Sequence, residues 1–422
     1  MDKKIGKIFK EQIQLIKPSQ DTLNKIKKIS KEFCEDLKKR LKKQRVEAEV
    51  FVGGSLAKET LVKKDHYDVD IFVRFDKKYD DSKISSMLGR VLGKNVRKVY
   101  GSRNYYQLNK EDILIEIVPV FKIKKPEEAV NVTDLSYFHV NYLLKKINKN
   151  KKLSDEIILA KAFAHAQDVY GAESYIHGFS GYALELLVCY YGSFLKFIKE
   201  IVNVKTKKDD KIIIDSGRFF KDRQEVLREM NKSKLSSPIV IVDPTFKERN
   251  ALSSLSKETF FKFQNACRGF LKNPSSEFFI KKNVFEDFRK FKNVKAIEIK
   301  TNRQAGDIAG TKSKKFFGFF IYKLKKEFDI RKSGFDYDDE KNVARFYFVL
   351  DSKGEDIVKG PPIANVHNLT KFKKVHAKAF IKKDFAYVKV KHLMSFEQWF
   401  KEFLKNEKKV IEGMGVKEIV KK

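Results

Sequence analysis

Three acidic residues have the types and spacing of a metal-binding carboxylate set. Asp68 and Asp70 lie two residues apart in Tyr67–Val73, whose alternating pattern predicts a β-strand, so both side chains project from one face. Two carboxylates held that close repel each other, and a multivalent cation relieves the repulsion. Glu116 lies in an otherwise apolar row of a second predicted strand, Asp112–Val118, where an unpaired carboxylate also needs a cation or a partner. Oxygen ligands suit hard cations, so the sequence predicts Mg²⁺, with Mn²⁺ as the alternative.

A glycine-rich turn precedes these carboxylates. Gly53-Gly54-Ser55 follows a predicted strand, Ala48–Val52, and a helix-length spacer separates it from Asp68. Glycine lets a backbone pass close to phosphates, and the N–H groups of the turn and the Ser55 hydroxyl could hold them if a helix starts there. Each feature alone is common in proteins, but the strand, turn, Asp-x-Asp strand and third acidic strand together form a specific pattern.

This pattern resembles the nucleotidyltransferase superfamily, whose members join such a loop to three carboxylates that hold two metal ions. Later segments sharpen the resemblance to the archaeal class I CCA-adding enzymes. They are Asp168–Glu173, Gly178–Phe194, Asp243–Ala251 and Gly360-Pro361-Pro362, in the order that this family shows. The likeness covers essentially the whole chain.

The resemblance implies a role for each matching residue. Asp68 and Asp70 would hold two Mg²⁺ ions, and Glu116 would be the third carboxylate, near the attacking 3′-hydroxyl. Arg249 would lie near the nucleotide base. The triphosphate contacts would come from a larger set: Gly53, Gly54, Ser55, Lys58, Ser136, His139, Lys161 and Tyr170. The implied reaction adds C, C and A to the 3′ end of tRNA from CTP and ATP, without a nucleic-acid template.

Two features depart from the family pattern. Position 116 is Glu where the family usually has Asp, so the carboxylate reaches farther by about one C–C bond. A family Tyr-x-x-His-Pro-Tyr stretch reads Tyr100-Gly101-Ser102-Arg103-Asn104-Tyr105 here, which weakens any base-selection role for that loop.

The spacing of Lys161 and Tyr170 sets a condition on the fold. Nine residues make 2.5 helical turns, so on one straight helix the two side chains would face opposite ways. Both can reach one triphosphate only if the helix that begins near Ser154 ends before Tyr170, and Gly171 is a plausible stop.

The predicted elements indicate a multidomain chain of α/β and α+β class. We expect a nucleotidyltransferase (polymerase beta-like) head in residues 1–145, in which Pro119 ends the third strand, and a helical central domain in 146–275 that completes the nucleotide site. Residues 276–422 would form a ferredoxin- or RRM-like RNA-binding body and tail. This last expectation rests on a strand, a helix and a strand at Val294–Ile299, Lys312–Phe328 and Ala344–Leu350.

Composition is consistent with an RNA partner. The formal net charge is +34, spread through the sequence, while 42% of residues are hydrophobic, so the chain is globular and attracts polyanions. We expect it to grip the acceptor stem and T-arm of tRNA, with a homodimer as one option. Three separated cysteines support neither disulfides nor a zinc site, and no apolar stretch is long enough for a membrane span, so a cytoplasmic location without a membrane partner is expected.

Other functions share parts of this pattern. A poly(A) polymerase or an A-adding enzyme would have the same loop and carboxylates. A non-catalytic RNA-binding protein of this fold would be expected to lose one of Asp68, Asp70 and Glu116, all of which remain acidic. An enzyme that modifies a small molecule would not need the basic C-terminal half.

Overall fold

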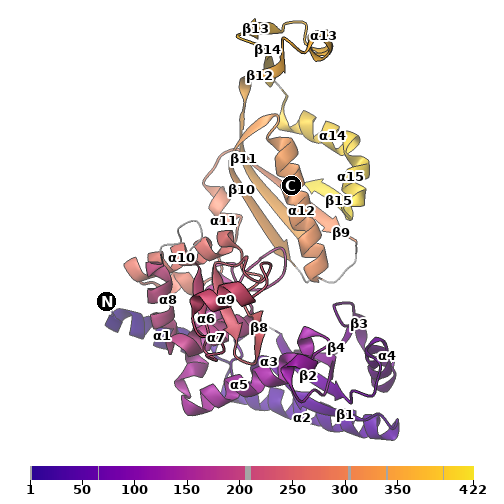
Figure 1. Cartoon of the computed structure of the whole chain (residues 1–422), viewed down its shortest axis with the longest axis vertical. Helices are drawn as coiled ribbons and strands as arrows, with labels where there is room; N and C mark the ends of the chain where they lie inside the picture. The colour runs from indigo at the N-terminus through magenta and orange to yellow at the C-terminus, as the bar shows by residue number, and fades with distance from the viewer. Residues whose placement is uncertain (1, 65, 205–210, 303–305, 339–340, 393) are drawn as a thin grey trace. The chain divides into compact units, whose positions relative to one another are not determined.

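The computed structural model of the chain describes residues 2–64, 66–204, 211–302, 306–338, 341–392 and 394–422. The chain forms two compact units, residues 1–282 and 283–422 (Figure 1). Each unit is described separately below. The borders expected at 145/146 and 275/276 remain predictions.

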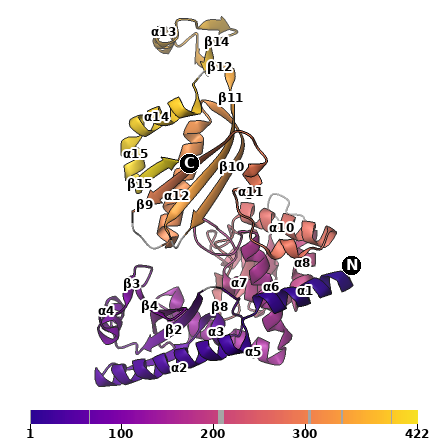
Figure 2. The same cartoon turned by 180° about the vertical axis from the view of Figure 1, so that it is seen from behind.

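A five-stranded sheet carries the acidic residues in the first unit. Its strands, in spatial order, are β1 (Ala48–Val52), β2 (Tyr67–Phe75), β5 (Ile113–Phe121), β4 (Tyr105–Lys110) and β3 (Arg97–Val99). β2 and β5 are parallel, whereas the other neighbouring pairs are antiparallel. The helices α2 (Gln20–Lys43) and α4 (Asp81–Leu92) supply apolar side chains to the core on one face of this sheet, and Figure 2 shows α2 running beside it. The opposite face is left to the carboxylates.

Six helices pack around a second core in the same unit. They are α1 (Asp2–Ile16), α5 (Ser136–Lys149), α6 (Lys152–Ala166), α7 (Gly181–Tyr191), α8 (Phe194–Asn203) and α10 (Lys257–Lys272). A small sheet of β6 (Ile212–Ile214), β7 (Ile239–Asp243) and β8 (Phe246–Asn250) packs with them, beside the short helix α9 (Arg223–Glu229). α6 and α7 are buried around most of their circumference, which explains their nearly continuous apolar sequences.

The second unit has the ferredoxin-like topology expected from its sequence. Its sheet contains β10 (Phe328–Asp338), β11 (Val343–Ser352), β9 (Val294–Thr301) and β15 (Val416–Lys421), all antiparallel to their neighbours. Along the chain the four strands are β9, β10, β11 and β15, so their spatial order from the β15 edge is fourth, first, third, second, as in a ferredoxin-like sheet. The helix α12 (Gly306–Leu324) follows the first strand, and α14 (Phe396–Asn406) and α15 (Lys408–Gly413) precede the last. Trp399 and its aromatic neighbours on α14 are buried in this core.

A separate hairpin module is inserted between β11 and α14. It comprises β12 (Gly354–Pro362), α13 (Val366–Val375), β13 (Phe380–Lys382) and β14 (Phe385–His392), with the strands in the order β12-β14-β13. No residue of α13 is buried. The module therefore contributes little to the core of the unit.

Two predicted boundaries were wrong. Pro119 does not end its strand, because β5 continues to Phe121. β4 pairs with β5 only as far as Ile117, so Pro119 lies where β5 has a single neighbour and a missing N–H is tolerated. The helix expected over Lys312–Phe328 begins at Gly306 and ends at Leu324, and Phe328 instead opens β10.

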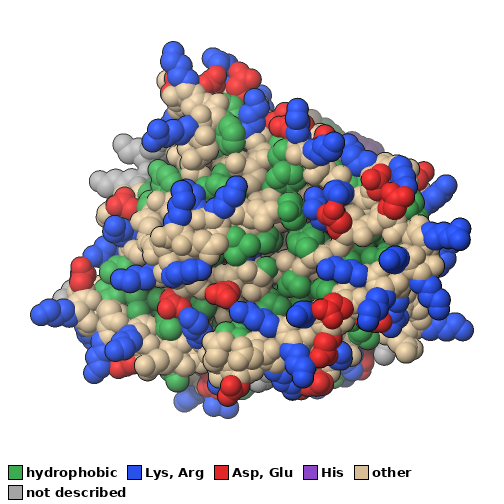
Figure 3. All heavy atoms as spheres, turned by 90° about the horizontal axis from the view of Figure 1, so that it is seen from below, with side chains coloured by type: hydrophobic (Ala, Val, Ile, Leu, Met, Phe, Trp, Pro, Cys, Tyr) green, Lys and Arg blue, Asp and Glu red, His purple; other side chains and the backbone are tan. Residues whose placement is uncertain are grey.

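Charged side chains are spread over the face that Figure 3 shows. On the face in Figure 3, Lys and Arg side chains stand among fewer Asp and Glu side chains and do not form one isolated patch. Among the described residues, none of the helices has the length and apolar character needed to cross a membrane.

Candidate active site

The three predicted carboxylates share one face of the sheet. Asp70 on β2 stands directly opposite Glu116 on the parallel strand β5, and Asp68 lies two residues earlier on the same face. The alternate residues of β2, Val69, Ile71 and Val73, are fully buried in the core beneath. The strand alternation read from the sequence is therefore confirmed, and all three acids project from the same surface.

Neighbouring side chains hold two of these carboxylates. Lys64 Nζ donates to Asp68 Oδ2 over 2.8 Å, and Gln107 Nε2 on β4 donates to Glu116 Oε1 over 2.7 Å. Among the described residues, no three Asp, Glu, His or Cys side chains converge as metal ligands. The donor set still suits a hard cation, since it consists of oxygen ligands on adjacent strands.

The pKa values of two carboxylates on this face are raised, mainly by burial. The pKa of Glu116 is raised to about 7, mainly by burial; the hydrogen bond from Gln107 opposes this shift, and Asp70 and Asp68 add to it. Burial is also the main cause that raises the pKa of Asp70; Lys58 opposes this shift and Asp68 adds to it. A cation at this face would relieve both effects, so the residues present fit a divalent metal.

The glycine turn lies directly against Asp70. The N–H of Gly53 donates to the Asp70 carbonyl over 2.8 Å, and Gly54 begins the short helix α3 (Gly54–Ala57) with φ +58°. A Cβ on Gly54 would lie 1.7 Å from Asp70 Oδ2, and one on Gly53 would lie 2.4 Å from the Phe72 ring. Only glycine allows this backbone to pass so close to the carboxylate. Ser55, the next residue, is partly exposed on α3.

A buried charge cluster joins the turn to the helices. Glu185 on α7 accepts from Lys58 over 2.6 Å at Oε2 and from Lys161 on α6 over 2.8 Å at Oε1. Lys161 also donates to Thr60 Oγ1 over 2.9 Å, and all four residues are buried. Burial raises the pKa of Glu185, but Lys161 and Lys58 outweigh it and lower the pKa to about 2, so the carboxylate is ionised. Burial lowers the pKa of Lys58, although Glu185 opposes the shift.

The condition on Lys161 and Tyr170 is met. α6 ends at Ala166 and the backbone turns at Asp168, with φ +51°, so Tyr170 lies beyond the helix. A Cβ built on Gly181 would lie 2.8 Å from the Tyr170 hydroxyl and 3.9 Å from Lys161 Cε, so both side chains flank the start of α7. Burial raises the pKa of Tyr170 to about 12, so its hydroxyl keeps its proton.

A second buried cluster surrounds Asp243 at the end of β7. Arg249 Nη1 donates to Asp243 Oδ2 over 2.6 Å and the Tyr182 hydroxyl donates to Oδ1 over 3.0 Å. His139 Nε2 stands 3.0 Å from Oδ2 without the alignment of a hydrogen bond, and its ring stacks on Tyr182 at 4.1 Å between centroids. Burial raises the pKa of Asp243, but His139 and Arg249 outweigh it and hold the pKa well below its usual range, whereas burial lowers the pKa of His139. Ser136 opens α5, one turn before His139.

Sequence reasoning missed three residues that organise the site. Glu185, Asp243 and Gln107 touch residues predicted to bind metal or nucleotide, but none was itself predicted to have a role. Glu185 carried a usable signal, because a lone acid in an apolar helix needs a buried cation. Gln107 carried no such signal in the sequence, because the register between β4 and β5 decides that it faces Glu116.

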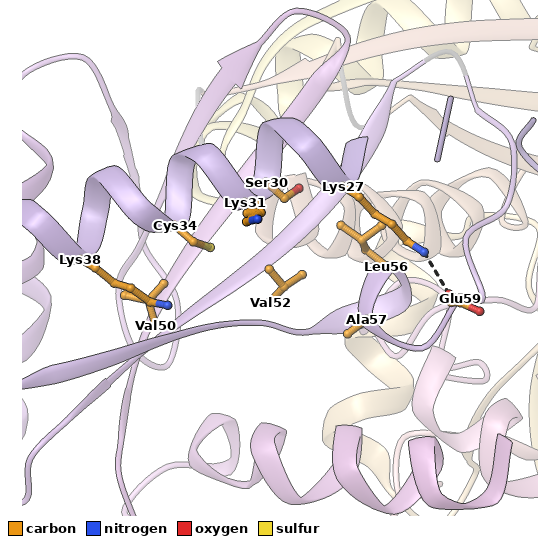
Figure 4. A pocket seen from close by; sticks show the side chains of 10 residues that line it. All are labelled: Lys27, Ser30, Lys31, Cys34, Lys38, Val50, Val52, Leu56, Ala57 and Glu59. Carbon is orange, nitrogen blue, oxygen red and sulfur yellow. Dashed lines mark hydrogen bonds and ion pairs between the residues drawn. The ribbon is translucent and has the colours of Figure 1, made fainter. Parts of the chain in front are cut away.

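The pocket in Figure 4 lies elsewhere. Its volume is about 410 Å³, and side chains of α2, β1 and α3 line it, among them Cys34, Val50 and Val52. Val50 and Val52 point to the helix-covered side of the sheet, opposite the carboxylates. This hollow is therefore no part of the candidate site.

Two family models match the first unit. Residues 4–137 match a second messenger oligonucleotide or dinucleotide synthetase domain, and residues 155–280 match the second domain of tRNA nucleotidyltransferases. The matched ranges contain the carboxylate sheet and the helices that carry Lys161 and Glu185, respectively.

Curated relatives extend the likeness over most of the chain. A CCA-adding enzyme of Nanoarchaeum equitans is 34% identical over 344 residues, which cover 80% of this chain and 82% of that protein. A CCA-adding enzyme of Methanocaldococcus jannaschii is 33% identical over 313 residues, 72% of this chain and 65% of that protein.

Solved structures share the fold. The Cid1 poly(U) polymerase with Mg and 3′-dATP bound gives a TM-score of 0.51 at 15% identity, covering 65% of this chain and 98% of that one. A cytoplasmic RNA terminal U-transferase gives 0.50 at 15% identity, covering 67% and 100%. At this identity the likeness concerns the fold, and it confirms the expected polymerase beta-like head.

Proposed function

This chain belongs to the archaeal class I CCA-adding enzymes, a family of nucleotidyltransferases, and we propose that it adds C, C and A to the 3′ end of tRNA from CTP and ATP. The observation that carries the proposal is 34% identity to a CCA-adding enzyme over 80% of the chain. The row of Asp68, Asp70 and Glu116 supports it, because a catalytically inactive RNA-binding relative would not need three acids on one face.

The carboxylate face is the proposed catalytic centre. Asp68, Asp70 and Glu116 would hold two divalent cations, Mg²⁺ or Mn²⁺, which when bound lower the pKa of the RNA 3′-hydroxyl and neutralise charge on the triphosphate. Asp70 on β2 lies against Gly54 of the glycine turn. Glu116 is on β5, which β2 separates from β1 and the turn, and this position suits a carboxylate near the attacking 3′-hydroxyl. The turn would thus hold the nucleotide phosphates beside Asp70, the carboxylate proposed to serve both substrates.

The buried lysines would balance the triphosphate charge. Lys58 and Lys161 share the single carboxylate of Glu185, and both lysines act electrostatically on Asp70. The neutral hydroxyls of Ser55, Ser136 and Tyr170 can donate hydrogen bonds to phosphate oxygens. Catalysis of this kind rests on positioning and charge compensation.

The Asp243 cluster would serve the base and the nearby phosphates. Asp243 holds the Arg249 guanidinium, and 24% of the Arg249 side chain is exposed, so its other N–H donors could meet a nucleotide base. His139 has a lowered pKa and is neutral near pH 7, so it would contact phosphate through a hydrogen bond and not as a cation.

The basic surface would hold the RNA. An A-form acceptor stem and T-arm offer phosphates and 2′-hydroxyls, so shape and charge dominate the recognition. A protein with this partner is expected in the cytoplasm. A homodimer stays a prediction that light scattering can check.

Nucleotide incorporation tests the function directly. Purified protein with Mg²⁺ is incubated with tRNA that lacks its C-C-A end and with CTP, ATP, UTP and GTP, singly and in pairs. We expect two additions with CTP alone and the complete end with CTP and ATP, and no addition with UTP or GTP. Long A or U tails would contradict the proposal in favour of a poly(A) or poly(U) polymerase.

A further inference from the structure

The third carboxylate has a dedicated partner on the neighbouring strand. Gln107 on β4 stands directly opposite Glu116 in the antiparallel register, and its Nε2 donates to Glu116 Oε1 over 2.7 Å. Both side chains are partly buried. The amide contact therefore lies at the carboxylate that the proposed function places beside the attacking hydroxyl.

Glu116 needs such a partner more than a shorter acid would. A glutamate has three side-chain torsions, and a carboxylate at the end of them takes several orientations unless a neighbour selects one. A hydrogen bond to one oxygen fixes the plane of the carboxylate and leaves the other oxygen for a cation.

The fold fixes the position of Gln107 itself. The loop before β4 is anchored by Arg103, which donates to Asp81 over 2.6 Å, to Asp134 over 2.5 Å and to the Pro119 carbonyl over 3.3 Å. The adjacent Tyr106 hydroxyl donates to the Ser85 carbonyl over 2.8 Å. β4 therefore cannot slide along β5 without breaking these buried contacts, and Gln107 stays opposite Glu116.

We propose that Gln107 is a positioning residue that orients the Glu116 carboxylate for catalysis. This inference rests on the proposed function, since it takes Glu116 as a catalytic carboxylate. Gln107 acts through Glu116 and does not touch the nucleotide, so its loss should slow the chemical step without weakening nucleotide binding.

The test compares Gln107→Met with the original chain in CCA addition. Methionine keeps the length of the side chain and removes the amide donor. We expect kcat to fall roughly tenfold, the usual effect of losing a hydrogen bond to a charged group, while KM for ATP stays within about twofold. The Mg²⁺ concentration for half-maximal activity should rise. Asn109→Leu, which removes an exposed amide from the same face of β4, is the matched control and should change neither value.

Repeating the substitution in a Glu116→Asp chain distinguishes a positioning role of Gln107 from direct contact with the substrate. In Glu116→Asp the carboxylate is shorter by about 1.5 Å and no longer reaches Gln107. Adding Gln107→Met to Glu116→Asp should therefore have little further effect on kcat. An equal loss in both backgrounds would overturn the proposal, because Gln107 would then act on the substrate itself. Where Glu116→Asp is too slow to measure, an unchanged kcat or an unchanged Mg²⁺ requirement in Gln107→Met overturns it.

The two hypotheses fail in different ways. If the original chain adds no nucleotide to tRNA, or if Glu116→Gln remains fully active, the proposed function of this site fails. If the original chain is active, Glu116→Gln is inactive and Gln107→Met behaves like the control, only the positioning role fails.

Discussion

Asp70 is the residue on which the proposed chemistry depends most. It stands opposite Glu116, lies against the glycine turn, and is affected electrostatically by Lys58, Asp68 and Lys161. We expect Asp70→Ala to abolish nucleotide incorporation, since the proposed shared metal ligand is lost, and to leave tRNA binding nearly unchanged. Incorporation of labelled ATP and filter binding of tRNA measure the two effects.

The control for this substitution is an acid on the same sheet outside the site. Asp112→Ala removes an exposed carboxylate just before β5 and should leave incorporation intact. Substantial activity in Asp70→Ala would contradict the assignment of the catalytic centre.

Sequence alone could predict the residues whose neighbours are local in the chain. Asp68 and Asp70 were predicted to share a face because strand alternation is a local rule, and their face is confirmed. Glu185 and Gln107 could not be found this way, because their partners lie 127 and 9 residues away, respectively, and tertiary packing or strand register brings them together. The nucleotide contacts of Ser136, His139 and Arg249 stay predictions.

Among the elements, the glycine turn before α3 has a sharp steric requirement. Gly54→Ala would combine a strained φ of +58° with a Cβ 1.7 Å from Asp70 Oδ2, so either the turn or the carboxylate must move. We expect incorporation to fall by about two orders of magnitude, the effect of a displacement near 1 Å at a catalytic group. Steady-state kinetics of ATP addition measures the loss.

Gly93→Ala is the matched control for the turn. Gly93 also has a positive φ, +83°, but nothing lies within 4 Å of its added Cβ. It should cost about 1 kcal/mol of stability and leave kcat unchanged. Equal effects of both substitutions on activity would show that backbone strain, and not contact with Asp70, decides the outcome at Gly54.

Helix α7 links the sheet to the helical core through Glu185. Glu185→Gln keeps the shape of the side chain but leaves Lys58 and Lys161 as two buried, unbalanced cations. We expect the free energy of unfolding to fall by about 3 kcal/mol and KM for ATP to rise several-fold, because both lysines lose the group that orients them. Denaturant unfolding and steady-state kinetics give the two values.

The pH dependence of this effect follows from the pKa of Glu185. Burial raises that pKa, but Lys161 and Lys58 lower it to about 2, below the usual value near 4 of an unfolded chain. The stabilisation is therefore present above about pH 4 and is lost as the pH falls toward 2. The stability difference between the original chain and Glu185→Gln should shrink over this range, whereas Glu200→Gln on the exposed face of α8 should show no difference at any pH.

The limits of prediction for the elements have physical causes. The strand, helix and strand that indicated a ferredoxin-like region in the second unit are present, whereas β10 between the helix and the second of these strands was not predicted. Helix ends are less well determined, because capping and packing decide them; α12 accordingly ends at Leu324 and not at Phe328. Pro119 was wrongly predicted to end β5, because a proline is tolerated where a strand pairs with only one neighbour.

At the level of the whole chain, the formal charge of +34 predicts how RNA binding responds to salt. Each phosphate that a Lys or Arg neutralises releases a condensed counterion, so the logarithm of affinity falls linearly with the logarithm of salt concentration. With roughly six phosphate contacts, we expect affinity for tRNA to drop by about 10³-fold between about 50 and 200 mM salt. The Asp70→Ala chain is suited to this titration, because nothing should be added to the RNA during the measurement. Affinity that changes by less than about tenfold over this range would show that the surface lysines are mostly solvated charge with no part in holding the RNA.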